Sequence, residues 1–302
     1  MKFAICIGFI TLKWGTPLMR FGLFCIFIIL CICSLLLGAE QIQWSTLFSF
    51  SHESWLTLTA SRIPRLITIV LTGIGLAVCG VILQHIVRNK FVEPETSGGL
   101  DAAKLGILVS LTLVPVTSTL SKMIFAIIFC FIASLIYIAI IRRIRFRNTV
   151  LVPVIGLMYG SVLSALAEFY AYRFNILQSM QGWLLGDFSK IVQGHYEVIY
   201  IIFPIVVLTY LFAHRFTVIS TTVITVGAIP FVGLVVPNLV ALKYGENLAK
   251  TLPIVALGGA SLLLICDILG RSIIYPFEVP IGLTAGGVGG IIFLILILRE
   301  FR

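Results

Sequence analysis

The stretch from Arg62 to Gly106 decides the fold, and it reads RIPRLITIVLTGIGLAVCGVILQHIVRNKFVEPETSGGLDAAKLG. It opens with two arginines around a proline and continues as an apolar run with four small residues, Gly73, Gly75, Ala77 and Gly80. Proline is tolerated in the first turn of a helix because that turn has no internal partner for its N–H group. Small residues let another helix approach closely, which matters in lipid, where no hydrophobic force drives helices together. The stretch therefore predicts a membrane-crossing helix that packs tightly against others.

The whole chain has the composition of a membrane protein. Of its 302 residues, 60% are hydrophobic and 11% are charged, and the mean hydropathy is +1.14. No soluble fold could bury so much apolar surface. In a bilayer only helices or closed barrels satisfy the backbone, and continuous apolar runs favour helices.

The apolar runs set the expected number of crossings. Three or four lie in the last third of the chain, and six more lie near residues 21–38, 66–87, 105–120, 123–141, 150–172 and 196–213. At about 20 residues per crossing, we expect an all-α polytopic membrane protein with about nine or ten transmembrane helices. The connecting loops are too short for a soluble domain, so residues 1–302 form one transmembrane domain.

The net charge of +9 indicates membrane topology and a lipid bilayer partner, not nucleic acid. If the N-terminus is cytoplasmic and the runs cross in turn, the inside face carries Lys2, Lys13, Arg20, Arg88, Lys90, Arg142, Arg143, Arg145, Arg147, Arg215, Arg271, Arg299 and Arg302. The outside face carries Arg62, Arg65, Lys122, Arg173, Lys190, Lys243 and Lys250, and Lys104 is ambiguous. This bias predicts that both termini are cytoplasmic.

Two stripes of small residues stand out. Gly156, Gly160 and Ser164 are spaced four apart, and Glu168 extends their stripe. Such a stripe marks either a tight helix contact or the wall of a transport pathway, and the sequence leaves both open. An acid near the bilayer is by default a functional hypothesis, although the position of Glu168 one turn from a polar loop favours an interfacial carboxylate. The second stripe consists of Gly282, Gly286 and Gly290.

Charged pairs and cysteines give further expectations. Asp267 and Arg271 are four apart and predict a structural ion pair on one helix face. Asp101 and Lys104 are three apart, but a solvated helix start is the simpler interpretation. The seven cysteines form no CxxC pair and predict free buried thiols, and no metal-ligand spacing surrounds the four histidines. An intramembrane enzyme is therefore the least favoured class.

Together these residues resemble the FecCD-type permeases, the membrane subunits of ABC importers for iron-siderophores, haem and cobalamin. The matching motifs occur in family order: RIPR at 62–65, RNKFVEP at 88–94, Trp-Leu-x-Gly at 183–186, GAIPFVGLVVPN at 227–238, GGASLLLICDILGR at 258–271 and EVPIGLTAGGVGG at 278–290. The two prolines of the fourth motif predict a broken helix. The resemblance implies a BtuC-like type II importer permease fold and transport of an iron-siderophore, with haem or cobalamin as alternative ligands. RNKFVEPETSGGLDAAKLG replaces the commoner RNPLAxP pattern and looks like the catecholate-type siderophore branch.

The resemblance also implies partners. A second permease, either a paralogue or another copy of this chain, would complete a central pathway, and an extracytoplasmic binding protein would deliver the ligand. Two cytoplasmic ATPase subunits would use ATP and Mg²⁺; this chain would bind no cofactor, since GENLAKT at 245–251 lacks the spacing of a nucleotide-binding loop. Arg62 and Arg65 match family arginines that meet acids of the binding protein, with lipid-headgroup anchoring as the alternative. Arg88 and Asn89 would form a cytoplasmic elbow.

One family segment is missing. Family members carry short cytoplasmic coupling helices after the sixth crossing, whereas here Ser220 runs directly into Thr221. Either the protein has this segment and the sequence omits it, which we favour, or the chain cannot contact its ATPase in the usual way. The alternative function is an ion-gradient-driven secondary transporter, which needs buried ionisable residues; the candidates are Glu168, Asp267 and Glu278.

Overall fold

The computed structural model describes residues 17–37, 52–87, 89–114, 119–143, 151–178, 229–245, 247–274 and 277–300, with a few single residues between 180 and 210. Its elements are α1 (Pro17–Leu36), α3 (His52–Thr57), η2 (Leu58–Arg62), α4 (Ile63–Val87), η3 (Pro94–Ser97), α5 (Gly99–Leu113), α6 (Thr119–Arg143), α7 (Leu151–Arg173), α11 (Val232–Tyr244), α12 (Leu248–Ile273) and α13 (Ile281–Glu300). Within the described part every element is helical, as predicted.

Five of the described helical spans are long and apolar enough to cross a membrane, and the apolar helices α1 and α11 are shorter. This confirms an all-α polytopic membrane protein. The predicted run at 196–213 and the junction at Ser220 lie almost wholly outside the described residues. The count of nine or ten crossings therefore stays a prediction.

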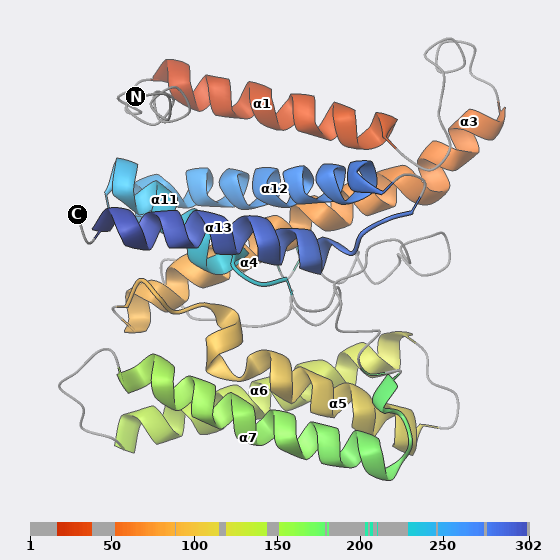
Figure 1. Cartoon of the computed structure of the whole chain (residues 1–302), viewed down its shortest axis with the longest axis vertical. Coiled ribbons are helices and arrows are strands. Elements are labelled where there is room, and N and C mark those ends of the chain that lie inside the picture. Colours follow the sequence, from red (N-terminus) through yellow and green to blue (C-terminus); the bar gives the residue numbers. More distant parts are fainter. Residues whose placement is uncertain are drawn as a thin grey trace.

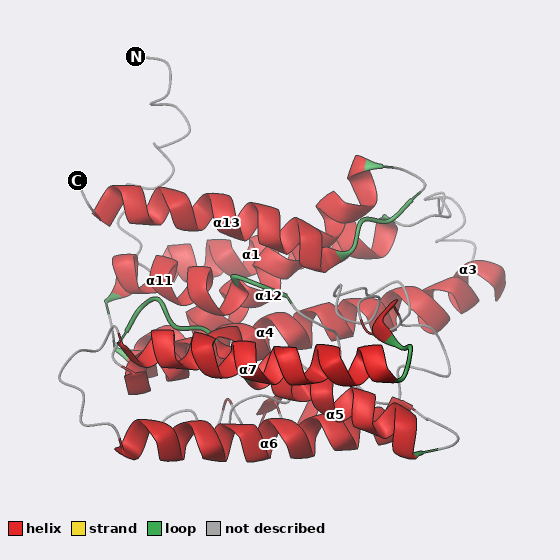
Figure 2. Cartoon of the chain, turned by 60° about the horizontal axis from the view of Figure 1, so that its bottom comes forward, coloured by secondary structure: helices red, strands yellow, loops and turns green. Residues whose placement is uncertain are grey.

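Helix α4, the predicted packing helix, lies between two groups of helices. Figures 1 and 2 show α1, α11, α12 and α13 on one side and α5, α6 and α7 on the other. The larger hydrophobic core joins Ile69 of α4 to residues of α11, α12 and α13. On the opposite face, Leu71 joins Ala103 of α5 and Met123 of α6 in a second core. Residues of one helix thus connect both halves of the bundle.

The small residues of α4 allow two other helix backbones to approach it. A Cβ on Gly73 would lie 2.6 Å from the carbonyl oxygen of Gly259 in α12, and a Cβ on Gly80 would collide with the carbonyl of Gly233 in α11. Real Cβ atoms essentially never come this close to a backbone oxygen, so larger residues would push the helices apart. The close packing expected from the sequence is confirmed.

The helical path widens just before Pro64. The N–H of Ile63 bonds the carbonyl of Leu58, five residues back, in the π-helical turn η2. Proline has no N–H to donate to the carbonyl four residues earlier, as an α-helix requires. The π-helical turn before it, with hydrogen bonds to the carbonyl five residues earlier, accommodates this missing hydrogen bond. α4 does begin one residue before Pro64 as expected, but the chain is already helical from His52.

The two prolines in 227–238 behave differently. Pro230 precedes α11, whose N-cap Phe231 has a left-handed φ of 69°. Pro237 lies inside α11, so the expectation that both prolines break the helix is wrong for this one. Proline has no N–H, so Pro237 cannot donate to the carbonyl of Gly233 four residues earlier in the helix. Gln84 of α4 donates its Nε2 to that oxygen instead, at 3.2 Å. The neighbouring helix supplies the missing donor.

The two ends of the bundle contain different basic residues from those expected. A groove brings Lys90 and Lys243 together beside the end of α13, and the start of α1 lies at the same end (Figure 1). We call it the Lys90 end; at the opposite Arg65 end, Arg65 and Arg271 bind one carboxylate. The structure therefore contradicts the prediction that Lys90 lies on the opposite side from Lys243 and from Lys250, in the first turn of α12, and that Arg65 lies on the opposite side from Arg271.

The error came from counting each apolar run as a full crossing. Helix α11 has only 13 residues. At about 1.5 Å per residue it reaches roughly 20 Å, short of the ~30 Å hydrocarbon thickness. α12 consequently runs from the Lys90 end to the Arg65 end.

Candidate functional site

Arg65 is the centre of an ion-pair network that joins α4, α12 and the segment before α13. Its Nη1 donates to Oε2 of Glu278 at 2.7 Å, and its Nη2 and Nε donate to Oδ1 of Asp267 at 2.8 and 3.2 Å. The side chain of Asp267 is 0% exposed, whereas those of Arg65 and Glu278 are 12% and 26% exposed. The network therefore has one buried anchor and one partly open carboxylate.

Arg271 closes the network on the other side of Asp267. Its Nη2 pairs with Oδ2 of Asp267 and donates to the hydroxyl of Ser34 in α1 at 2.8 Å. The structure thus contains the predicted Asp267–Arg271 pair and adds a second guanidinium to it. A buried carboxylate is costly unless its oxygens find charged donors, and here two arginines provide them.

Arg62 and Arg271 together cap the C-terminal end of α1. Arg62 donates to the main-chain carbonyls of Leu35 and Leu36 at 2.6 and 3.0 Å. Arg271 donates to those of Ser34 and Leu37 at 3.1 and 2.5 Å. The last carbonyls of a helix have no intrahelical partner and carry partial negative charge, so two cations suit them well. Arg62, a docking candidate from the sequence, is buried and holds α1 to the bundle.

Sequence reasoning missed Ser34 and the link from Arg65 to Glu278. Arg65 and Asp267 are 202 positions apart, and Arg65 and Glu278 are 213 apart. The available signal was that each acid near a predicted crossing needs a cationic partner. Asp267 and Glu278 were recognised as such acids, but spacing alone paired only Asp267, and only with Arg271.

At the Lys90 end, the elbow at residues 89–98 joins α4 to α5. The N–H of Asn89 bonds the carbonyl of Gln84 at 3.1 Å, and its Oδ1 accepts the N–H of Phe91 at 2.9 Å. Glu93 caps η3 and accepts the N–H of Phe231 on Oε2 at 3.2 Å. The elbow is thereby tied to the start of α11. Arg88, predicted beside Asn89, lies outside the described residues.

Two glutamates of the elbow, Glu93 and Glu95, have raised pKa values. Burial raises the pKa of Glu93 to about 7, against the lowering effect of the Phe231 N–H. Burial and the negative charge of Glu93 raise the pKa of Glu95 to about 8. The positive charge of Lys104 lowers this pKa, and the negative charge of Asp101 raises it further. Asp101 and Lys104 form an ion pair at 2.8 Å with both side chains largely buried, so the solvated helix start expected there is wrong. The elbow therefore exchanges protons near neutral pH.

The predicted stripe on α7 divides into two parts. A Cβ on Gly156 would collide with the carbonyl of Thr96, and one on Gly160 would lie 3.3 Å from Cα of Gly98, so this half packs against the elbow. The other half points outward: the hydroxyl of Ser164 donates to exposed Glu168 at 3.4 Å. Exposed apolar side chains also cover other parts of the α7 surface, namely Leu157, Met158, Val162, Leu166 and Phe169.

The stripe on α13 faces the start of α11. A Cβ on Gly286 would lie 3.5 Å from Cγ of Pro230, and one on Gly290 3.9 Å from the ring of Phe231. These are ordinary contact distances, so the positions tolerate small additions. Gly282 is half-buried in the first turn of α13.

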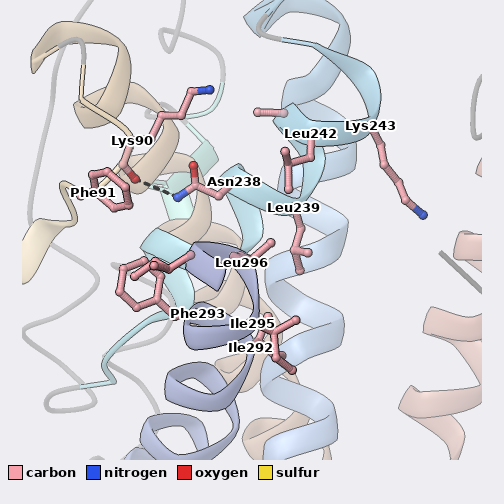
Figure 3. A pocket seen from close by; sticks show the side chains of 12 residues that line it. Lys90, Phe91, Asn238, Leu239, Leu242, Lys243, Ile292, Phe293, Ile295 and Leu296 are labelled. Carbon is pink, nitrogen blue, oxygen red and sulfur yellow. Dashed lines mark hydrogen bonds between the residues drawn. The ribbon is translucent and has the colours of Figure 1, made fainter. Parts of the chain in front are cut away.

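A groove of about 780 Å³ opens at the Lys90 end between the elbow, α11 and α13 (Figure 3). Apolar side chains form most of its lining, including Leu239, Leu242, Ile292, Phe293, Ile295 and Leu296. Asn238 connects the elbow to α11, because its Nδ2 donates to the carbonyls of Lys90 and Leu234, both at 2.8 Å. Figure 3 shows the amino groups of Lys90 and Lys243 pointing away from the apolar floor.

The fold, with buried ion pairs at one end and a basic rim at the other, is that of a polytopic helical membrane protein. The FecCD transport family matches residues 26–222 and 216–299. This chain belongs to that family.

Relatives match over nearly the full chain. The sequence is 59% identical to the ferric-anguibactin transport system permease protein FatD of Vibrio anguillarum, over 93% of this chain and 99% of the relative. It is 40% identical to the petrobactin import system permease protein YclN of Bacillus subtilis, over 92% and 97%. A solved inward-facing metal-chelate type ABC transporter has the same fold, with a TM-score of 0.77 at 22% identity, over 94% of this chain and 100% of that chain.

Proposed function

We propose that the chain is the membrane permease subunit of an ABC importer that carries ferric-siderophore complexes into the cytoplasm. The 59% identity to a ferric-anguibactin permease over nearly both whole chains carries this proposal. Haem and vitamin B12 permeases are more distant, at 28% identity, which makes those ligands the weaker alternatives. The catecholate-type branch suggested by the elbow stays a prediction.

The importer in this proposal has three further kinds of subunit. A second permease, identical or paralogous, faces this one across the pathway; two cytoplasmic ATPases bind ATP and Mg²⁺; and an extracytoplasmic binding protein delivers the siderophore. This chain needs no cofactor of its own.

We assign Ser164 and Glu168 on the outward side of α7 to the pathway or to the second permease, because they are accessible in the single chain. Gly156 and Gly160 are less suited to that role, because they are covered by the elbow.

The charge of the two ends supports an orientation in the inner membrane. Lys90, Lys243 and Lys250 lie at one end together with Arg143 at the end of α6 (Figure 1). Basic residues beside crossings favour the cytoplasmic side. We therefore propose that the Lys90 end, with both termini, is cytoplasmic and that the Arg65 end receives the binding protein.

Of the two docking arginines expected from the sequence, we retain Arg65. Arg62 is buried and engaged with α1, so reversing its charge would disturb folding before docking. Arg65 keeps a partly open edge toward Glu278. An arginine at such an edge suits recognition of a carboxylate on a partner.

The segment expected after Ser220 remains a proposal with two supports. The two family matches meet at residues 216–222, where the sequence analysis located the missing segment. The alignment with the Vibrio relative has 310 positions but spans 93% of the 302 residues, about 281, so about 29 positions have no counterpart here. Inserting the relative's segment between Ser220 and Thr221 should increase association with the ATPase. Unchanged association would show that this chain contacts the ATPase without it.

Uptake in a strain lacking its own siderophore permeases tests the function. Cells expressing the chain with its partner subunits should accumulate radiolabelled iron from ferric anguibactin or ferric petrobactin. Orthovanadate, which inhibits ABC ATPases, should stop uptake, and a proton uncoupler should not stop it in ATP-clamped vesicles. Uptake that follows the ion gradient would instead support a secondary transporter, and uptake of haem or vitamin B12 alone would replace the siderophore as ligand.

A further inference from the structure

We propose that Glu278 occupies the place at Arg65 that a carboxylate of the binding protein takes when it docks. The inference rests on the proposed function, because it requires a binding protein at the Arg65 end. It goes further by assigning Glu278 as an internal competitor for the docking site.

The geometry of Arg65 separates a permanent partner from an exchangeable one. Two of its nitrogens, Nε and Nη2, face Asp267, which is fully buried and is also held by Arg271 and Ser34. Its third nitrogen, Nη1, faces Glu278, which is 26% exposed. A carboxylate approaching from outside the protein would therefore meet Arg65 on the Glu278 side.

Burial also makes the Arg65–Glu278 ion pair easier to replace than the Arg65–Asp267 ion pair. Removing one partner of a buried ion pair is strongly destabilising, because the other charge stays buried. The Arg65–Glu278 pair is more exposed than the Arg65–Asp267 pair, so water compensates for more of its loss. An incoming carboxylate that replaced Glu278 would keep Arg65 neutralised, so the exchange would leave no buried charge without a counterion.

The exchange would also act on α13. Glu278 lies in the segment between α12 and α13, which main-chain bonds hold in two places. The N–H of Val279 bonds the carbonyl of Gly270 at 3.0 Å, and the N–H of Phe277 bonds that of Ile274 at 2.7 Å. Without the Arg65–Glu278 ion pair, the segment that leads into α13 would keep these two main-chain bonds to α12 and lose this link to α4. Docking would in this way loosen the start of a helix that reaches the Lys90 end.

The test compares binding-protein affinity of Glu278→Gln and the wild type in the full importer, reconstituted in nanodiscs. The probe is the extracytoplasmic binding protein of the same importer, loaded with its ferric siderophore. Because Glu278→Gln removes the negative charge that competes for Nη1 of Arg65, we expect roughly threefold to tenfold tighter binding. Ser272→Lys is the matched control: it adds the same unit of positive charge at an exposed position on the last turn of α12 and leaves Arg65 paired.

Tighter binding by Glu278→Gln with little change in Ser272→Lys supports the exchange. Equal or weaker binding by Glu278→Gln, or equal tightening in both variants, overturns it. If the wild-type importer does not bind the protein at all, the proposed function fails instead.

A second measurement needs only the wild type and so survives a variant that does not fold. Amide hydrogen exchange at Val279 should become faster when the binding protein docks, because its segment loses the Arg65 contact. Slower or unchanged exchange at Val279 on docking would also overturn the proposal.

Discussion

The two ends of α4 hold buried charge in opposite ways. At the Arg65 end, the carboxylates of Asp267 and Glu278 meet two guanidiniums, so each carboxylate has a cation beside it. At the Lys90 end, Glu93 and Glu95 lie near each other, and burial raises their pKa values to about 7 and about 8. The comparison teaches that the two ends differ in the partners of their acids: arginines bond the carboxylates at the Arg65 end, whereas burial dominates at the elbow glutamates.

The largest expected effect comes from removing the anchor of the Arg65 end. Asp267→Asn leaves Arg65 and Arg271 close together with too little negative charge, and it should destabilise the protein by about 3–5 kcal/mol. Thermal unfolding in detergent and the yield of folded protein measure this. The control Ser272→Ala, at an exposed position on the same helix, should change stability by less than ~0.5 kcal/mol. An Asp267→Asn protein as stable as the wild type would contradict the anchor role.

The next effect concerns the close packing that lies between the two ends. A Cβ on Gly259 would collide with the carbonyl of Gly73, so Gly259→Val should destabilise by at least ~1–3 kcal/mol. Gly287→Ala, on α13 with no atom near the added methyl group, should be neutral or up to ~1 kcal/mol stabilising. Denaturation curves of both variants give the values. Equal effects of the two substitutions would refute the packing argument.

The Lys90 end should make stability depend on pH. The raised pKa values of Glu93 and Glu95 mean that the folded protein binds more protons than the unfolded chain from about pH 4.5 to about pH 8. The stability from protonated Glu95 is thus lost as pH rises through about 8. Glu95→Gln should be about 1–3 kcal/mol more stable than the wild type above that pH, and closer to it near pH 6.

Unfolding measured across pH checks this expectation. Glu168→Gln, a change of an exposed carboxylate on α7, is the control and should leave the pH dependence as in the wild type. If Glu95→Gln has the same pH profile as the wild type, the elbow does not titrate as described.

The smallest effect tests the polar contact between α1 and the ion-pair network. Ser34→Ala removes one hydroxyl that accepts from Arg271, and should cost about 0.5–1.5 kcal/mol. Ser161→Ala is the control, because its hydroxyl bonds only the carbonyl of Leu157 in its own helix among the described contacts. Unfolding of both in detergent measures the difference. A Ser161→Ala loss equal to that of Ser34→Ala would mean that the network adds nothing at Ser34.

Much of the fold was predictable from local patterns. The apolar runs gave α1, α4, α6 and α7 to within a few residues, and the glycines of α4 predicted its close packing. The spacing of Asp267 and Arg271 predicted their pair, since four residues bring side chains together on any helix. The predicted separation of Lys90 from Lys243 and of Arg65 from Arg271 was wrong, because an apolar run does not show whether its helix is long enough to cross.

The sequence by itself determined that this is a helical membrane protein and, through motifs along the whole chain, its family. Hydropathy and local spacing suffice for that, since every backbone group in lipid must be satisfied within helices. Only the tertiary structure decided that Arg62 holds α1 and that Arg65 divides its donors between Asp267 and Glu278. Those partners are far apart in the chain, and burial, which sequence cannot measure, is what makes their pairing necessary.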